Sequence, residues 1–175
     1  PRAGRQCVHV ARTPTEEPVE RGERIRRSSG LAERLRQRDG DRAPPRIDHV
    51  GVAVESIAAA LPLYVDDLGC EVSEVFDVPA EKVRAVMVST GESRIELLEA
   101  TRPDSPIARF ITKRGEGIHH IAMKVGDVEA AVTRLCASGR RLVTEDVQSG
   151  GAGGYRYIFV HPKSAGGVLL ELIEE

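Results

Sequence analysis

Apolar positions along residues 46–175 recur in two successive sets that share one order of spacings. Each set opens with a segment in which apolar residues alternate, continues with apolar residues every three or four positions, and closes with shorter alternating segments. Alternation indicates β-strands and the wider spacing indicates helices. The first set predicts a strand at 47–54, a helix at 55–68 and strands at 71–76, 83–89 and 94–99. The second predicts a strand at 118–125, a helix from Asp127 to Gly139 and strands near 141–145, 155–161 and 167–173.

The two sets are also alike residue by residue at their first and last strands. Ile47-Asp48-His49-Val50-Gly51 returns as Ile118-His119-His120-Ile121-Ala122, and Ile95-Glu96-Leu97-Leu98 returns as Leu170-Glu171-Leu172-Ile173. The sequence therefore predicts an α+β fold of two tandem βαβββ modules. Each module by itself leaves one apolar face of its sheet exposed to solvent. The other module or a partner chain must cover that face.

We expect three parts along the chain. Residues 1–45 hold several prolines and no sustained period, which is typical of a disordered tail. Residues 46–175 form the folded domain, with module one at 46–102, a linker helix at 103–115 and module two at 116–175. Asp104 or Ser105 is placed to cap the linker helix, with Pro106 in its first turn.

Charge and composition exclude several classes of partner. Residues 1–46 carry twelve Arg against seven acidic residues and have no aromatic residues among them, so we expect no nucleic-acid surface there. The most apolar stretch is too short and too interrupted for a membrane span. Three widely spaced cysteines indicate reduced thiols. We therefore expect a cytoplasmic protein, or one of the mitochondrial matrix if the Arg-rich tail is a transit peptide.

The two modules bring a histidine and a glutamate each. Strict alternation places His49 and His120 on the strand faces that carry small or apolar residues, and Asp48 and His119 on the opposite faces. Glu96 and Glu171 stand in apolar strands, where an unpaired carboxylate is costly. Buried salt bridges and hydrogen-bonded core histidines are the plain alternatives. Four matched residues instead favour one shared metal ion, held by His49, Glu96, His120 and Glu171.

The donor types indicate which ions this site takes. Structural zinc sites depend on thiolates, and this set has none. Two imidazoles and two carboxylates with open positions suit a divalent Lewis acid, for which we expect Co²⁺ first, with Ni²⁺, Mn²⁺ or Zn²⁺ as alternatives.

With these motifs in view, residues 46–175 resemble the vicinal oxygen chelate (glyoxalase/bleomycin resistance) superfamily, and within it the methylmalonyl-CoA epimerases. The resemblance is carried by Ile47-Asp48-His49-Val50-Gly51, Ile95-Glu96-Leu97-Leu98, Asp104-Ser105-Pro106-Ile107-Ala108, Gly117-Ile118-His119-His120-Ile121, and His161-Pro162-Lys163 with the following Gly166 to Leu172. The histidine and glutamate strands fit the whole superfamily, whereas the central and C-terminal segments are specific to the epimerases.

The resemblance implies a metal-dependent epimerase that interconverts the two epimers of methylmalonyl-CoA by a 1,1-proton transfer through a metal-stabilised enolate. It also implies a homodimer. Epimerisation needs an acid/base at each face of the planar enolate. We expect Glu171 to be one of them. Some family members carry a second Glu where this chain has Ala85, so we expect Glu96 to combine metal binding with the second proton transfer.

Three other functions stay open from the sequence. A glyoxalase I-type lactoylglutathione lyase would use the same four ligands. An extradiol dioxygenase needs two His and one carboxylate, which would leave Glu96 surplus. A metal-free ligand-binding module of the same fold would not need the four residues together.

Overall fold

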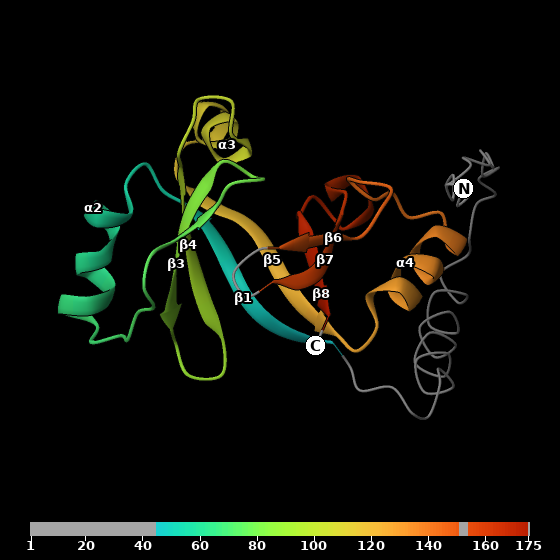
Figure 1. The fold of residues 1–175 in the computed structure, drawn as a ribbon, viewed down its shortest axis with the longest axis horizontal. Helices are drawn as coiled ribbons and strands as arrows, with labels where there is room; N and C mark the ends of the chain where they lie inside the picture. The colour runs from blue at the N-terminus through green and yellow to red at the C-terminus, as the bar shows by residue number, and fades with distance from the viewer. Residues whose placement is uncertain (1–44, 151–153, 175) are drawn as a thin grey trace, which may run out of the picture. The chain divides into compact units, whose positions relative to one another are not determined.

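The computed structural model describes residues 45–150 and 154–174, so the predicted tail lies outside the described residues except for Pro45. The described strands are β1 (Arg46–Ala53), β2 (Phe76–Val78), β3 (Val83–Ser89), β4 (Arg94–Ala100), β5 (Gly117–Val125), β6 (Gln148–Gly150), β7 (Tyr155–Val160) and β8 (Leu170–Glu174). The described helices are α2 (Ile57–Pro62), the π-helical turn η1 (Leu63–Asp67), α3 (Pro106–Arg114), α4 (Val128–Ala137) and the 3-10 turn η2 (Pro162–Ser164). The predicted order of elements, two βαβββ modules joined by a helix, is confirmed (Figure 1).

The strands form one mixed sheet in the order β2-β3-β4-β1-β5-β8-β7-β6. This order is symmetric about the central pair, because each module places its first strand beside its last. β1 pairs parallel with β4, β5 pairs parallel with β8, and β1 and β5 pair antiparallel with each other. The duplication therefore brings the two histidine strands side by side at the centre, each flanked by its own glutamate strand.

The helices begin where the sequence supplies caps. Ser56, Ser105 and Asp127 accept hydrogen bonds from the first turns of α2, α3 and α4. Glu99 and Glu174 stand three residues after the matched glutamates and accept from the backbone N–H groups of the first residues of α2 and α4. The sequence repeat therefore also includes the two glutamates that accept hydrogen bonds from the helix N-termini.

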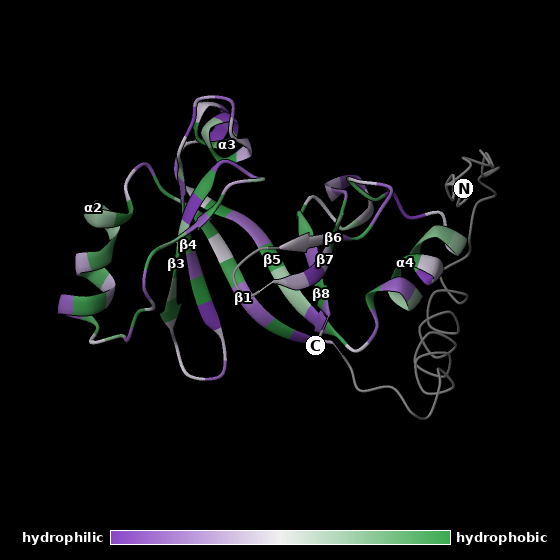
Figure 2. Cartoon of the chain, in the orientation of Figure 1, coloured by the Kyte–Doolittle hydropathy of each residue, from purple (hydrophilic) through white to green (hydrophobic). Residues whose placement is uncertain are grey.

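Each module packs its helix on the sheet. Val128 and Ala131 of α4 are buried against Ile158 and Leu172, and Ile57 of α2 is buried against a cluster that includes Leu97. Figure 2 shows hydrophobic and hydrophilic residues interleaved along both helices, as expected for helices with one buried face. Among the residues that the structure describes, no helix combines the length and apolarity needed to cross a bilayer.

The single helix predicted at 55–68 is wrong in its second half. α2 ends at Pro62, and the chain continues as η1, in which the Leu68 N–H donates to the Leu63 carbonyl five residues earlier. Pro62 has no N–H to give to the α-helical ladder, and a wider π-type turn follows it.

The outer strands are shorter than their patterns predict. The segment 71–76 gives only the isolated bridge Val72↔Val88 before β2, and 141–145 gives only the bridge Leu142↔Val160 before β6. β8 begins at Leu170 because Gly166 and Gly167 adopt positive φ angles of 66° and 93°. Outer strands have a neighbour on one side only, so fewer hydrogen bonds hold their ends.

A candidate metal centre between the two modules

The two central strands and their parallel neighbours place the four predicted residues together. In the register across the sheet, Gly51 stands between Glu96 and His120, and Ala122 stands between His49 and Glu171. Gly51 is required for this packing, because a Cβ there would lie 2.3–2.7 Å from ring atoms of His120. Small residues at these two places leave room for the imidazoles to turn toward one another.

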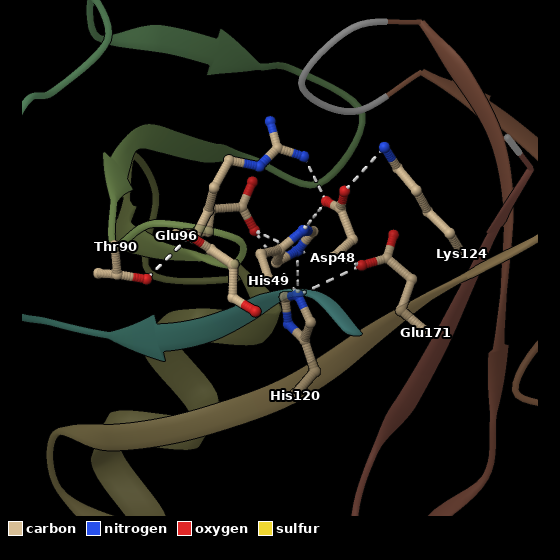
Figure 3. Close-up of polar contacts among 9 residues, drawn as sticks. Asp48, His49, Thr90, Glu96, His120, Lys124 and Glu171 are labelled. Carbon is tan, nitrogen blue, oxygen red and sulfur yellow. Dashed lines mark hydrogen bonds and ion pairs between the residues drawn. The ribbon is translucent and has the colours of Figure 1, made fainter. Parts of the chain in front are cut away.

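The side chains converge on one point. The Nε2 atoms of His49 and His120 lie 3.0 Å apart. Oε2 of Glu96 lies 3.3 Å from Nε2 of His49 and 3.6 Å from Nε2 of His120. Oε2 of Glu171 lies 3.6 Å and 3.2 Å from the same two nitrogens. Figure 3 shows the imidazoles between the two carboxylates.

These separations fit a shared metal ion. Two ligand atoms about 2.1 Å from one ion are about 3.0 Å apart when they subtend a right angle at it. His49, Glu96 and His120 are all buried and offer ligand atoms within 4.8 Å of one another. Glu171 is close to both imidazoles, and its side chain is 12% exposed. The arrangement can hold a divalent cation and leave open positions on the cavity side.

Charge at the centre also favours a cation. Burial by itself lowers the pKa of His49, but the adjacent carboxylates of Glu171, Glu96 and Asp48 raise it to about 10. Burial raises the pKa of Glu171, but hydrogen bonds from His120 and His49 hold it at about 2. The carboxylates therefore stabilise positive charge between them, which protons or a bound dication can supply.

Strict alternation is wrong for Asp48 and His119, which were expected to face away from the site. The β1–β5 ladder pairs Ile47 with Met123 and then His49 with Ala122, so Asp48 is skipped. It pairs Gly51 with His120 and then Val52 with Ile118, so His119 is skipped. Each is the extra residue of a bulge, and a bulge can turn a side chain to a face that simple alternation forbids.

Both bulged residues contact the histidine that follows them. Oδ2 of Asp48 lies 2.8 Å from Nδ1 of His49, and Nδ1 of His119 lies 3.1 Å from Nδ1 of His120. Arg94 and Lys124 form ion pairs with the Asp48 carboxylate, and Figure 3 shows Lys124 beside it. Such contacts fix the tautomer of a metal-binding imidazole and leave its Nε2 free to coordinate.

The centre opens into a cavity of about 290 Å³. Much of its wall is apolar, including Val83, Leu98 and Ile107. Glu81 and Tyr157 also line it, and the phenol of Tyr157 donates a hydrogen bond to Oε1 of Glu81 at 3.3 Å. Sequence reasoning missed these two residues because they lie in different modules and belong to no motif of the repeat.

A second, more open hollow adjoins this cavity and shares Pro106, His119 and Leu169 with it. The exposed cationic residues Arg109, Lys113 and Arg114 of α3 lie along it. An apolar chamber containing the candidate centre therefore continues into a positively charged groove.

Known proteins share both the sequence and the fold. Residues 48–159 match the Glyoxalase/Bleomycin resistance protein/Dioxygenase superfamily. The chain is 41% identical to the mitochondrial methylmalonyl-CoA epimerase of Homo sapiens over 128 residues, which are 73% of this chain and 72% of the relative. The structure of methylmalonyl-CoA epimerase from Mycobacterium tuberculosis is 37% identical, with a TM-score of 0.69 over 73% of this chain and 86% of that one. A methylmalonyl-CoA epimerase in complex with methylmalonyl-CoA and NH₄⁺ is 34% identical, with a TM-score of 0.71 over 76% and 96% of the two chains.

Proposed function

Since the chain belongs to the glyoxalase/bleomycin resistance superfamily and, within it, to the methylmalonyl-CoA epimerases, we propose that it interconverts the (2R) and (2S) epimers of methylmalonyl-CoA. It is thus an isomerase. The observation that carries the proposal is the convergence of two imidazoles and two carboxylates at the end of an apolar cavity, in a fold shared with an epimerase bound to methylmalonyl-CoA.

We assign His49, Glu96, His120 and Glu171 as ligands of a divalent cation. The α-carbon of the substrate lies between a thioester and a carboxylate, so loss of its proton gives an enolate. The cation, when bound, supplies Lewis acidity for the negative charge that develops on the substrate oxygens. We propose Co²⁺ as the ion, with Ni²⁺, Mn²⁺ and Zn²⁺ as alternatives, because the donor set combines imidazole with carboxylate and lacks thiolates.

The residues around the centre have separate tasks in this proposal. Asp48 and His119 orient the two imidazoles. Val83, Leu98 and Ile107 exclude water from the reacting carbon, which strengthens electrostatic interactions in the cavity. Glu171 is the acid/base at one face of the enolate, because its carboxylate lies at the cavity end of β8 beside both imidazoles. From the sequence, Glu96 is the expected carrier for the second proton transfer.

The cationic groove along α3 suits the nucleotide end of a CoA thioester. Arg109, Lys113 and Arg114 offer positive charge to its phosphates, while the acyl group enters the apolar chamber next to it.

We also propose a homodimer. Ile47 of β1 and Ile118 of β5 are 49% and 64% exposed, which is unusual for large apolar residues on central strands. A second copy of the chain would cover Ile47, whereas Ile118 also lines the cationic groove. Light scattering on the purified protein measures this directly.

The test of the proposed reaction is a stereospecific conversion assay. Metal-loaded protein is mixed with one pure epimer of methylmalonyl-CoA, and formation of the other is followed with a mutase that accepts only that product. The glutathione hemithioacetal of methylglyoxal is the parallel substrate. Conversion of the thioester alone supports the epimerase, whereas turnover of the hemithioacetal alone would replace it with glyoxalase chemistry.

A further inference from the structure

A 1,1-proton transfer needs a proton carrier at each face of the enolate, and both carboxylates that flank the imidazole pair are assigned as ligands of the cation. This inference rests on the proposed epimerase function. Glu96 and Glu171 both face the imidazole pair. Ala85, where some epimerases carry a Glu, is fully buried among Val83, Leu98 and Ile107 and has no acidic or basic group. The far side of the chamber therefore needs another carrier.

Tyr157 supplies a hydroxyl on the required face of the sheet. β7 pairs Tyr157 with Ile173 and Phe159 with Glu171, so Tyr157 lies two cross-strand pairs beyond the carboxylate, on the same face of the sheet. Its side chain is buried, with 7% of the residue exposed. Edge-to-face ring contacts run from His120 to Phe159 at 5.8 Å and from Phe159 to Tyr157 at 5.7 Å, which fix the phenol at a distance from the imidazoles.

Glu81 approaches the phenol from the other module. It lies in the turn between β2 and β3, near one edge of the sheet, whereas β7 lies near the opposite edge. The Tyr157–Glu81 hydrogen bond therefore joins the two halves of the sheet across the cavity. A carboxylate that accepts from a buried phenol can also take its proton.

The turn that carries Glu81 is held in an uncommon backbone conformation. Lys82 is the one non-glycine residue with positive φ among the described residues, at 56°. Its carbonyl accepts from the Thr101 N–H, and its ammonium forms an ion pair with Asp104. Left-handed backbone at such a residue is costly and persists where surrounding contacts enforce it, often at functional sites. Here it places Glu81 at the cavity wall.

Two other polar groups in the cavity wall, those of Asp48 and His119, have partners that fix them elsewhere. Asp48 is held by His49, Arg94 and Lys124, and His119 contacts His120. Tyr157 and Glu81 are bonded to each other instead, and neither belongs to the metal centre.

We propose that Tyr157 and Glu81 form the second proton carrier, a relay in the chamber wall that serves one face of the enolate while Glu171 serves the other. The α C–H bond breaks as its proton moves to the phenol oxygen, and its electron pair remains in the enolate. In the same step the phenol O–H bond breaks and that proton moves to the Glu81 carboxylate. This direction starts with a proton on Glu171 and with Glu81 ionised. The Glu171 carboxyl gives that proton to the other face of the carbon, which gives the opposite epimer and leaves Glu171 ionised and Glu81 protonated. In the reverse direction Glu171 removes the proton and the relay returns one.

The raised pKa of the Tyr157 phenol agrees with a proton relay and not with a free phenolate that acts as the base. Burial, together with the negative charges of Glu81 and Glu171, raises the pKa of Tyr157 to about 12. The phenol therefore stays protonated at neutral pH and accepts a proton only when it passes its own to Glu81.

The experiment follows each pure epimer separately in D₂O with metal-loaded wild type, Tyr157→Phe and Glu81→Gln. Wild type exchanges the α-proton of both epimers and interconverts them. In either variant Glu171 still exchanges the α-proton of one epimer with retention of configuration. The other epimer keeps its α-proton instead of exchanging it for deuterium, and the rate of epimerisation falls about 100-fold or more. Glu81→Gln is the sharper variant, because an amide oxygen still accepts the phenol hydrogen bond but cannot take its proton.

Two controls separate this role from a structural one. Tyr64→Phe removes a phenol that packs outside the cavity, and it keeps wild-type rates. Glu96→Gln tests the alternative carrier by the same exchange pattern. Two results would refute the relay. Either Tyr157→Phe and Glu81→Gln epimerise the substrate at rates within a few-fold of wild type, or each variant loses α-proton exchange of both epimers to the same extent. A wild type that exchanges neither epimer would instead refute the epimerase function itself.

Discussion

Asp48 and His119 occupy matching places in the two modules, each as the bulged residue one position before a histidine of the centre. Each lies against Nδ1 of that histidine, at 2.8 Å for Asp48 and 3.1 Å for His119. One is a carboxylate and the other an imidazole. Burial and the neighbouring His120 lower the pKa of His119 to about 4, so it is neutral near pH 7 and able to accept a hydrogen bond. The two modules therefore place a hydrogen-bond acceptor at the same position beside the histidine, but one uses a carboxylate and the other an imidazole.

The first prediction concerns these acceptors. Asp48→Ala and His119→Phe should each weaken metal binding about 10- to 100-fold, because the following imidazole loses the contact that fixes its tautomer. His119→Gln keeps an acceptor and should retain most of the affinity. Competition with a chromogenic chelator measures all three proteins. Equal affinity of His119→Phe and wild type would remove the positioning role.

Gly51 is the second target. Gly51→Ala puts a Cβ 2.3–2.7 Å from the His120 ring, so the imidazole must leave its present position. We expect a loss of metal affinity of about 10-fold or more, as for other disturbances of ligand orientation. Ala60→Gly in α2 is a control of the same size far from the centre. Chelator competition and the conversion assay on both variants check the prediction, and a fully active Gly51→Ala protein would contradict it.

The third prediction is that metal binding stabilises the fold. The four ligands come from both modules, so a cation that binds only the folded chain adds about 2.7 kcal/mol at a free concentration 100 times its Kd. Chelator treatment should lower the Tm, and added Co²⁺ should restore it. His49→Ala removes a ligand and should abolish this response, which differential scanning calorimetry will show.

Tyr157 gives a prediction about alkaline pH. Its pKa is raised from the ordinary 10.0 to about 12 by burial and by Glu81 and Glu171. Because the folded-state pKa is the higher one, the protonated phenol stabilises the fold below pH 10. This contribution is lost as the pH rises toward 12. Ultraviolet difference titration should show one of the three tyrosines ionising late in wild type, and no such late step in Tyr157→Phe.

The groove along α3 gives a prediction about substrate binding. Lys113→Ala and Arg114→Ala together should raise KM for the CoA thioester several-fold with little change in kcat, because they contact a part of the substrate that does not react. Wild type should show a stronger salt dependence of KM than the double variant. Arg134→Ala and Arg140→Ala on the α4 side are the matched charge control. Equal KM values for the three proteins would place the phosphates elsewhere.

The duplicated sequence predicted the fold, and it predicted that His49, His120, Glu96 and Glu171 lie close together. Both predictions were possible because alternation within a strand and repetition between modules can be read directly from the sequence. It did not predict that Asp48 and His119 face the centre, since a bulge depends on how two distant strands pair. The contact of Tyr157 with Glu81 could not be predicted either, because it joins residues that are 76 positions apart and lie in different modules.

The central claim is that this chain removes and returns the α-proton of methylmalonyl-CoA at a metal-dependent site. The most direct measurement is proton NMR of each pure epimer in D₂O with the Co²⁺-loaded protein, with and without chelator. We predict loss of the α-proton signal and formation of the other epimer, both abolished by the chelator and by His49→Ala. Retention of the α-proton in both epimers with Co²⁺, Ni²⁺, Mn²⁺ and Zn²⁺ would contradict the account.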